Sequence, residues 1–208
     1  YLHGYVDAFE AVMLGPDFAD PELGYRAWID VDSWVDFAII QELNRNIDGY
    51  KKSSYYTKEP DIDGGRVHMG PLWDFNLAFA NVDYCEGALT AGFVYQTNWC
   101  FNYPDNYTPW WESLLMEDPW FAQQLRCRWE ELRQDVLSIE NIHGIIDEQV
   151  ALLVDAEPRD HARWDVIGTY VWPNAQVADS YAGEIAFLKD WISQRVAWLD
   201  ANLPGDCP

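Results

Sequence analysis

The chain has 208 residues, 49% of them hydrophobic, and its 35 acidic against 13 basic residues give a formal charge of -22. With 12 Trp and 12 Tyr, it is too rich in large apolar side chains for a disordered protein. The length fits one domain, residues 1–208. The charge argues against nucleic acid or anionic membranes as partners, and no apolar run reaches the roughly 18 residues of a membrane span.

The first hundred residues predict two helices and a hairpin. Tyr5–Leu14 reads as a short helix that ends at Gly15-Pro16. Asp32–Asn46 predicts a helix with Asp32 as its N-cap, and its apolar side chains lie nearly all round, so we expect it to be buried. Ser54–Lys58 and Arg66–Met69 flank a Gly-rich turn and predict a β-hairpin. The aromatic stretch from about residue 81 to 109 predicts an ordered loop.

The second half is predicted to be helical. One helix starts at Asp118-Pro119 and runs to about Leu137, and Ser138 caps the next, which runs to about Val154. Residues 158–174 are less regular, and Ala182–Asn202 predicts a closing helix. The whole is therefore expected to be an α+β protein, mainly helical, with one small hairpin.

Four cysteines, Cys85, Cys100, Cys127 and Cys207, have no spacing typical of a zinc site. An even number in an acidic, Trp-rich chain suits an exported protein with two disulfides. Four cysteines permit three connectivities, and we favour Cys85 with Cys100 and Cys127 with Cys207. The alternative is four reduced cysteines in the core of a cytosolic protein.

Two acids on either side of the predicted hairpin are the main candidates for chemistry. Asp48 follows the buried helix, and Asp74 stands inside the apolar run Leu72–Phe75. A carboxylate that accepts a hydroxyl proton and another that holds a metal are what phosphoryl transfer requires. As structural alternatives, Asp48-Gly49 is a common turn dipeptide and Asp74 could cap a turn.

Oxygen donors near these acids could complete a metal site. Ser53 lies five residues after Asp48, the offset at which a protein-kinase catalytic loop places a metal-binding Asn. Asn46 and Asn76 carry amide oxygens that suit Mg²⁺, although Asn46 could equally cap the helix and Asn76 could form a turn.

Basic and aromatic side chains close to Asp48 are candidates for nucleotide contacts. Lys51, Lys52 and Lys58 lie within eleven positions of Asp48, and Lys51 and Lys58 are candidate phosphate ligands. Solvated, charge-balancing lysines are the alternative. Trp73 could provide an aromatic platform for adenine or a sugar ring, or simply pack in the core. The chain has no P-loop and no H-E-x-x-H motif.

These residues resemble the CotH kinase family, the spore-coat-protein-H-like atypical kinases of bacterial spores and of many secreted bacterial proteins. The resemblance covers most of the chain and is carried by four segments: Gly24–Asp36, Asn46–Tyr55, Gly70–Asn76 and Trp191–Pro204. Within them stand NIDGYKKSSY and GPLWDFN. A protein-kinase core has a similar order, with the catalytic-loop acid before the metal-binding Asp-Phe.

The resemblance implies a protein-kinase-like large lobe in which the hairpin region carries both acids. It implies ATP with Mg²⁺ or Mn²⁺ as cofactors and protein Ser or Thr hydroxyls as acceptors. Asp48 matches the catalytic-loop acid, and Asp74 matches the metal-binding acid of the W-D-F-[DN] motif, in which Asn76 replaces a common second Asp. No nucleotide-covering loop is recognisable, so the small lobe is expected upstream of Tyr1.

The family also implies a secreted or cell-surface bacterial protein, with a spore coat, cell surface or extracellular matrix as its surroundings. Two other interpretations stay open. The chain could be a non-catalytic, carbohydrate-associated module that keeps the fold as a scaffold. It could also be a metal-dependent hydrolase that uses the same acids, although it lacks the further ligands of a two-metal site.

Overall fold

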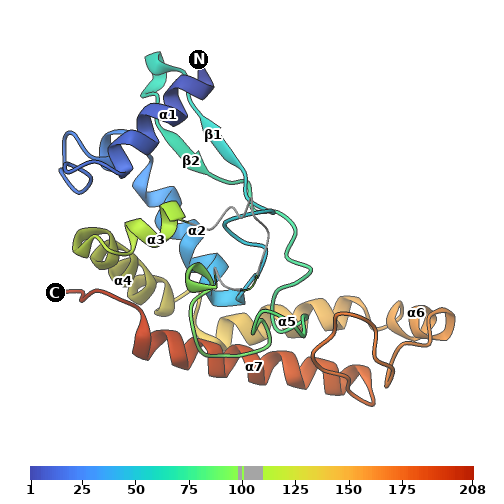
Figure 1. Ribbon diagram of the computed structural model, residues 1–208. Helices are drawn as coiled ribbons and strands as arrows, with labels where there is room; N and C mark the ends of the chain where they lie inside the picture. The colour runs from blue at the N-terminus through green and yellow to red at the C-terminus, as the bar shows by residue number, and fades with distance from the viewer. Residues whose placement is uncertain (98–99, 101–109) are drawn as a thin grey trace.

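The computed structural model describes residues 1–97, 100 and 110–208. The described part is mainly helical, with a single two-stranded antiparallel sheet (Figure 1). The helices are α1 (Leu2–Met13), α2 (Val31–Asn44), α3 (Trp110–Leu115), α4 (Pro119–Arg133), α5 (Ile139–Leu152), α6 (Glu157–Arg163) and α7 (Tyr181–Asn202). The strands are β1 (Tyr56–Lys58) and β2 (Val67–Met69).

Helix α2 lies at the centre and packs against α4, α7 and β2. Nearly every side of it is buried, as the even distribution of its apolar residues predicts. The main core joins it to aromatic and aliphatic side chains of α4 and α7. These core residues include Trp34, Phe37, Ile39, Leu43, Phe121, Leu125, Trp129, Trp191, Val196 and Leu199.

The start of α2 corrects the sequence prediction by two residues. Asp30, and not Asp32, is the N-cap: its carboxylate accepts from the Ser33 N–H at 3.0 Å. Asp32 lies inside the first helical turn, where an acid still interacts favourably with the helix dipole. An Asp is favourable both at the N-cap and in the first turn, so residue type alone does not tell which of the two is the N-cap.

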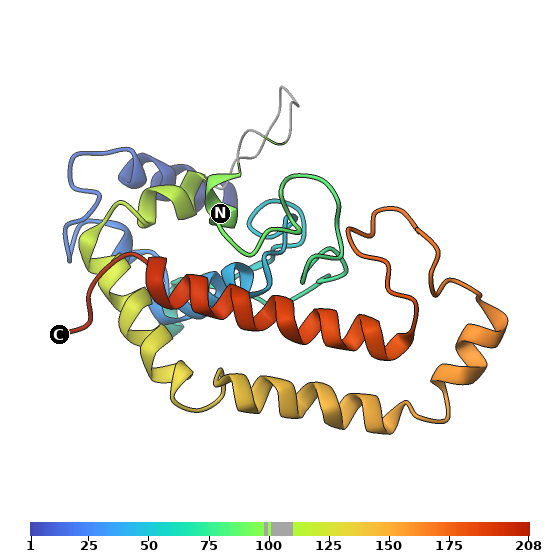
Figure 2. The same ribbon diagram turned by 90° about the horizontal axis from the view of Figure 1, so that it is seen from below.

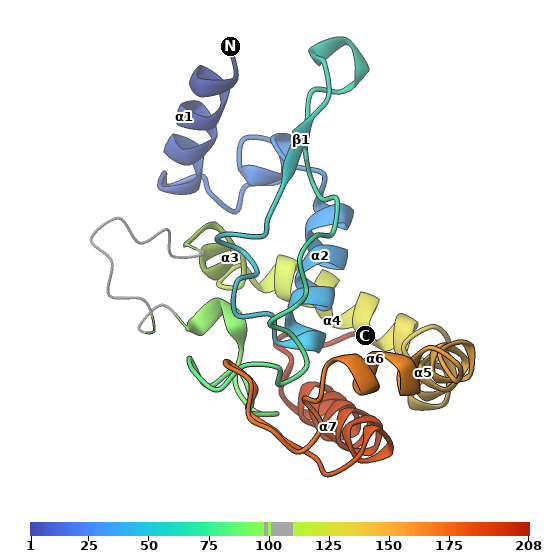
Figure 3. The ribbon, with the colours of Figure 1, turned by 90° about the vertical axis from the view of Figure 1, so that its right-hand side faces the viewer.

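The hairpin is fixed to the N-terminal end of α2. Tyr56 pairs with Met69 and Lys58 with Val67, so each strand is shorter than predicted. The Val67 carbonyl accepts from the Asp30 N–H at 2.9 Å and from Trp34 Nε1 at 3.0 Å. Helix α1 and the hairpin project together from one end of the molecule, as Figures 1 and 3 show.

The opposite end is built from α5 and α7, which run alongside each other (Figure 2). Ser138 caps α5 as predicted, with its hydroxyl accepting from the Asn141 N–H. Helix α4 ends at Arg133, a turn before the predicted Leu137. The short helices α3 and α6 were not predicted, because each is less than two turns long and carries no clear apolar period.

Two disulfides close loops of very different length. Cys85 pairs with Cys100 over a separation of 15 residues, and Cys127 pairs with Cys207 over 80. This is the pairing favoured from the sequence, and it fits an extracellular protein. No helix of the described residues is long and apolar enough to cross a membrane.

Candidate active site

The segment after α2 brings Asp48 to the surface of the core. Helix α2 ends at Arg45, whose backbone is left-handed with φ of 51°. The Asn44 carbonyl then accepts from the Phe79 N–H at 2.8 Å, which joins this end of the helix to the chain that follows Asp74. This backbone hydrogen bond links the end of α2, just before Asp48, to the segment just after Asp74.

Asn46 shapes the turn on which Asp48 stands. It is fully buried, and its side-chain oxygen accepts from the Asp48 N–H at 3.2 Å. The Asp48 carbonyl in turn accepts from the N–H groups of Lys52 at 3.1 Å and Ser53 at 3.2 Å. This turn fixes the spacing between Asp48 and Ser53. In this structure Asn46 lies under the loop and holds its backbone.

The Asp48 carboxylate is partly sheltered from water, with 19% of the side chain exposed. Its Oδ1 atom is buried and accepts no hydrogen bond from the described residues. Lys52 Nζ lies 3.6 Å from that oxygen, which is ion-pair distance but beyond a hydrogen bond. This oxygen has spare acceptor capacity but is shielded from solvent, whereas the carboxylate as a whole stays partly exposed.

Ser53 connects the Asp48 turn to Asp74. Ser53 is buried, and its hydroxyl donates to Asp74 Oδ2 at 3.4 Å. Asp74 has a positive φ of 63°, an uncommon backbone conformation for a non-Gly residue that is enriched at functional sites. The structure thus places Ser53, on the turn that carries Asp48, beside Asp74, which is 21 positions further along the chain.

The neighbours of Asp74 are solvent-facing. Trp73 is 58% exposed and meets the Tyr55 ring edge-on at a centroid distance of 6.4 Å, so it is not a core residue. Asn76 is also exposed, and its carbonyl accepts from Asn81 Nδ2 at 2.8 Å. Both side chains are accessible to a ligand at Asp74.

The three lysines separate into two groups. Lys51 and Lys52 stand on the Asp48 turn, and burial lowers the pKa of Lys51 to about 8 against the opposing effect of Asp48. Lys58 instead lies on β1, where its Nζ contacts Asp61 at 2.9 Å and the Tyr1 hydroxyl at 2.8 Å. The structure therefore places Lys51, and not Lys58, near Asp48.

The donor set around Asp74 suits a hard divalent cation only in part. Among the described residues, no group of three or more His, Cys, Asp or Glu side chains could enclose a metal. Mg²⁺ commonly needs just one or two carboxylates, with water and phosphate oxygens as its other ligands. The exposed Asp74 carboxylate beside the Ser53 hydroxyl fits such an open site.

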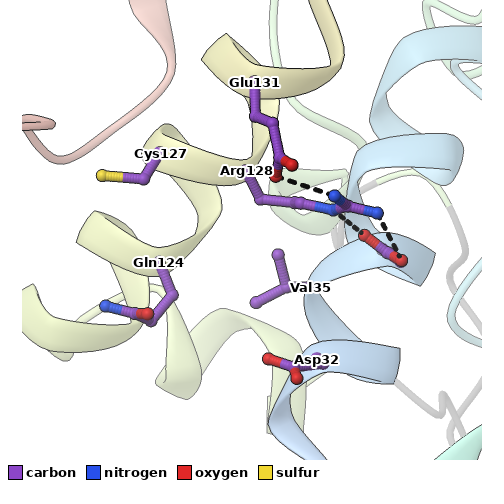
Figure 4. A pocket seen from close by; sticks show the side chains of 7 residues that line it. Asp32, Val35, Gln124, Cys127, Arg128 and Glu131 are labelled. Carbon is purple, nitrogen blue, oxygen red and sulfur yellow. Dashed lines mark hydrogen bonds and ion pairs between the residues drawn. The ribbon is translucent and has the colours of Figure 1, made fainter. Parts of the chain in front are cut away.

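A hollow of about 460 Å³ lies elsewhere, between α2 and α4 (Figure 4). Arg128 projects into it but is engaged by Asp36 and Glu131, each at 2.8 Å. These carboxylates raise the pKa of Arg128, and they leave little positive charge for an anionic ligand. A second, apolar hollow of about 490 Å³ includes Gly70, Pro71 and Leu72 and so approaches Asp74.

Comparison with known families identifies the family of the chain. The family described as CotH kinase protein matches residues 1–199. The chain belongs to the CotH kinase family. No curated protein and no solved structure gave a match.

In this CotH chain, the sequence analysis did not identify Gln41 and Glu42, two buried polar residues of α2 that support the candidate site. Gln41 is fully buried in α2, and an added Cβ on Gly49 would lie 2.3 Å from its Oε1. Glu42 accepts from the N–H groups of Val94 and Tyr95 at 2.8 and 3.1 Å. A Gln-Glu pair inside a helix that is otherwise apolar all round was the signal that could have found them.

Proposed function

We propose that this CotH-family protein transfers the γ-phosphoryl group of ATP to Ser or Thr hydroxyls of a protein, outside the cell. Asp48 serves as the base, and Asp74 serves as the metal ligand. The proposal rests above all on the proximity of the Ser53 hydroxyl to Asp74 Oδ2, at 3.4 Å, because this long contact brings the turn that carries Asp48 next to the second acid. Family membership supports the kinase class.

Asp48 would accept the proton of the attacking hydroxyl. Its Oδ1 has no hydrogen bond within the described residues, and Asn46 and the turn hold the backbone behind it. A base that is fixed in this way loses little motion when the acceptor hydroxyl arrives. Phosphoryl transfer requires mainly positioning and charge neutralisation, so a well-held carboxylate is sufficient for this role.

Asp74 would hold Mg²⁺ or Mn²⁺ with Ser53 and Asn76 as further oxygen donors. When bound, the cation would neutralise phosphate charge, which the acidic chain does not do by itself. Ser53 orients the Asp74 carboxylate through its hydroxyl, and Lys51 adds positive charge near the phosphates. Trp73 offers an exposed ring beside the same carboxylate.

A transfer assay with radiolabelled ATP and Mn²⁺ on the full-length protein tests this function. Asp48→Asn and Asp74→Ala should each lower labelling by about 100-fold or more, because each removes a group needed in the transition state. Asp63→Ala is the matched control, since this acid is exposed at the hairpin tip. Equal labelling by wild type and Asp74→Ala would contradict the proposal.

A non-catalytic, carbohydrate-binding role has one observation in its favour. Trp172 is 69% exposed and stacks on Tyr84, with ring planes 9° apart. Exposed aromatic faces of this kind can bind sugar rings. Calorimetry with a glycan panel separates the two functions, because sugar binding that survives Asp48→Asn and Asp74→Ala, in a protein that transfers no phosphate, favours the module.

A further inference from the structure

Glu112 is a buried acid at the contact between α3 and the hairpin. Only 5% of the residue is exposed. Its Oε1 accepts from the Tyr56 hydroxyl at 3.4 Å, which is long for an O–H···O bond. Such a bond compensates poorly for the water that an ionised carboxylate loses on burial.

Aromatic rings surround the contact. Tyr56 packs against Trp34 of α2 and Trp111 of α3, with centroid distances of 5.7 and 5.5 Å. Trp111 is fixed in turn by its indole N–H, which donates to Glu10 of α1 at 3.1 Å. The carboxyl therefore lies among apolar surfaces contributed by three elements.

The polar groups that face the Glu112 carboxyl are its own backbone N–H and tyrosine hydroxyls, and not cations. Tyr56 reaches it from β1, and Tyr50 lies near enough for the charge of Glu112 to raise the pKa of that phenol. The Tyr50 hydroxyl donates to the Glu42 carboxylate, and the Tyr95 carbonyl of η3 (Val94–Gln96) accepts from the Ser113 hydroxyl, next to Glu112. No lysine or arginine of the described residues acts on Glu112.

The hairpin connects this contact to the candidate site. Tyr56 lies three residues after Ser53, and it pairs across the sheet with Met69, five residues before Asp74. The Gly70 N–H also donates to the Tyr55 carbonyl at 2.9 Å. A shift of β1 against α3 would therefore move both partners of the hydrogen bond between Ser53 and Asp74.

We propose that Glu112 is a protonation-dependent positioning residue. With its carboxyl neutral, α3 and the hairpin pack together and hold Ser53 and Asp74 in register; ionisation loosens this contact. Its role in transfer rests on the proposed kinase function, whereas the loosening itself does not.

The direction of the pH effect follows from the burial of Glu112. Burial raises the pKa of this carboxyl from 4.5 to about 7. The packed state therefore favours the protonated acid, and the stabilisation is complete below pH 4.5 and is lost as the pH rises through 7. The opening equilibrium of the hairpin should increase about 30-fold between pH 5.5 and 8.5.

Amide hydrogen exchange of residues 55–70 and 110–115, corrected for the intrinsic rate at each pH, measures this opening. Wild type should lose about 30-fold protection between pH 5.5 and 8.5, and Glu112→Gln should show no such change. The control is Glu117→Gln, which neutralises an exposed acid just after α3 and should behave as wild type. Equal protection of wild type at both pH values would overturn the proposal.

Tyr56→Phe provides a second variant in case Glu112→Gln does not fold. It removes the hydroxyl that lowers the pKa of Glu112, so the midpoint of the exchange transition should move to higher pH. An unchanged midpoint contradicts the proposal. A protein that transfers no phosphate would still show the exchange transition, so failure of the kinase function is distinguishable from failure of this inference.

Discussion

Gly49, directly after Asp48, is a glycine because of space and not because of its backbone angles. Its φ is not positive, but a Cβ would meet Gln41 Oε1 at 2.3 Å and the Asn46 carbonyl at 2.9 Å. The sequence pattern Asp-Gly indicated a turn, and the structure adds that the turn lies directly on a buried amide. The glycine thus allows Asp48 to approach α2 closely.

Gly49→Ala should therefore destabilise the fold by about 1–3 kcal/mol, because Gln41 and the loop must move apart. It should also reduce phosphoryl transfer, since the displaced segment carries Asp48. Urea unfolding and the transfer assay measure the two effects. The matched control is Gly144→Ala, at an α5 position where a Cβ has no neighbour within 4 Å. A Gly49→Ala protein as stable and active as wild type contradicts the close-packing argument.

The lowered pKa of Lys51 predicts that nucleotide binding depends on pH. Its pKa is lowered to about 8 by burial, so the ammonium is charged at pH 7 and largely neutral at pH 9. If the charge contacts phosphate, KM for ATP should rise about tenfold from pH 7 to 9. Lys51→Arg stays charged throughout and should give a flat profile. A tenfold rise that persists in Lys51→Arg assigns the effect to another group.

At the scale of elements, α2 and α7 are joined by a buried ion pair. The Arg195 guanidinium is fully buried and donates to the Glu42 carbonyl at 2.7 and 2.8 Å and to the Glu42 carboxylate at 3.3 Å. Burial raises the pKa of Glu42, an effect that Arg195 opposes, and burial lowers the pKa of Arg195 to about 10. Each charge depends on the other.

Arg195→Met should cost about 3–5 kcal/mol in the free energy of unfolding at neutral pH, because it leaves the Glu42 carboxylate buried without its cation. The double variant Glu42→Gln with Arg195→Met should recover part of that loss, since both charges of this pair are then removed and the buried Arg45 is the charge that stays close by. Urea unfolding of wild type, the two single variants Glu42→Gln and Arg195→Met, and the double variant forms the cycle. A loss below about 1 kcal/mol in Arg195→Met would show that water reaches Glu42.

Much of the fold follows from local patterns in the sequence. The helix α2, the hairpin and the closing helix each carry an apolar period, a cap or a turn that can be read locally. What could not be read is contact between distant residues: Arg195 and Glu42 are 153 positions apart, and no local pattern joins them. Helix α6 was missed for the opposite reason, because none of its side chains is buried and it has no apolar face to detect.

The candidate site was predictable as a set of residue types but not as a geometry. The motifs predict Asp48 and Asp74 as candidates, and the offset from Asp48 predicts Ser53. Lys58 contacts Asp61 and Tyr1, in a part of the hairpin that is far from Asp48. This contact depends on how α1 packs beside β1, which the sequence does not reveal. Glu112 was invisible for a similar reason, because its burial depends on Tyr56, 56 positions away.

At the scale of the whole molecule, the two disulfides stabilise different regions. Cys127–Cys207 joins α4 to the C-terminal segment over 80 positions, far from the candidate site. Cys85–Cys100 spans 15 positions, and Cys85 packs with the fully buried Ile47 and Val82 directly beneath the Asp48 turn. Loop length therefore predicts that Cys127–Cys207 matters more for stability, whereas location predicts that Cys85–Cys100 matters more for activity.

Removing Cys127–Cys207 by paired Ala substitutions should lower the free energy of unfolding by about 4 kcal/mol. Removing Cys85–Cys100 should lower it by about 3 kcal/mol, because closing the shorter loop costs the unfolded chain less entropy. At a temperature where both variants are folded, the Cys85/Cys100 variant should have the lower transfer activity. The Cys85/Cys100 variant loosens Ile47, next to Asp48, and should lose most of its rate, while the Cys127/Cys207 variant retains it. Thermal unfolding and the transfer assay on the same preparations decide between this ranking and a purely global effect, in which activity would simply follow stability.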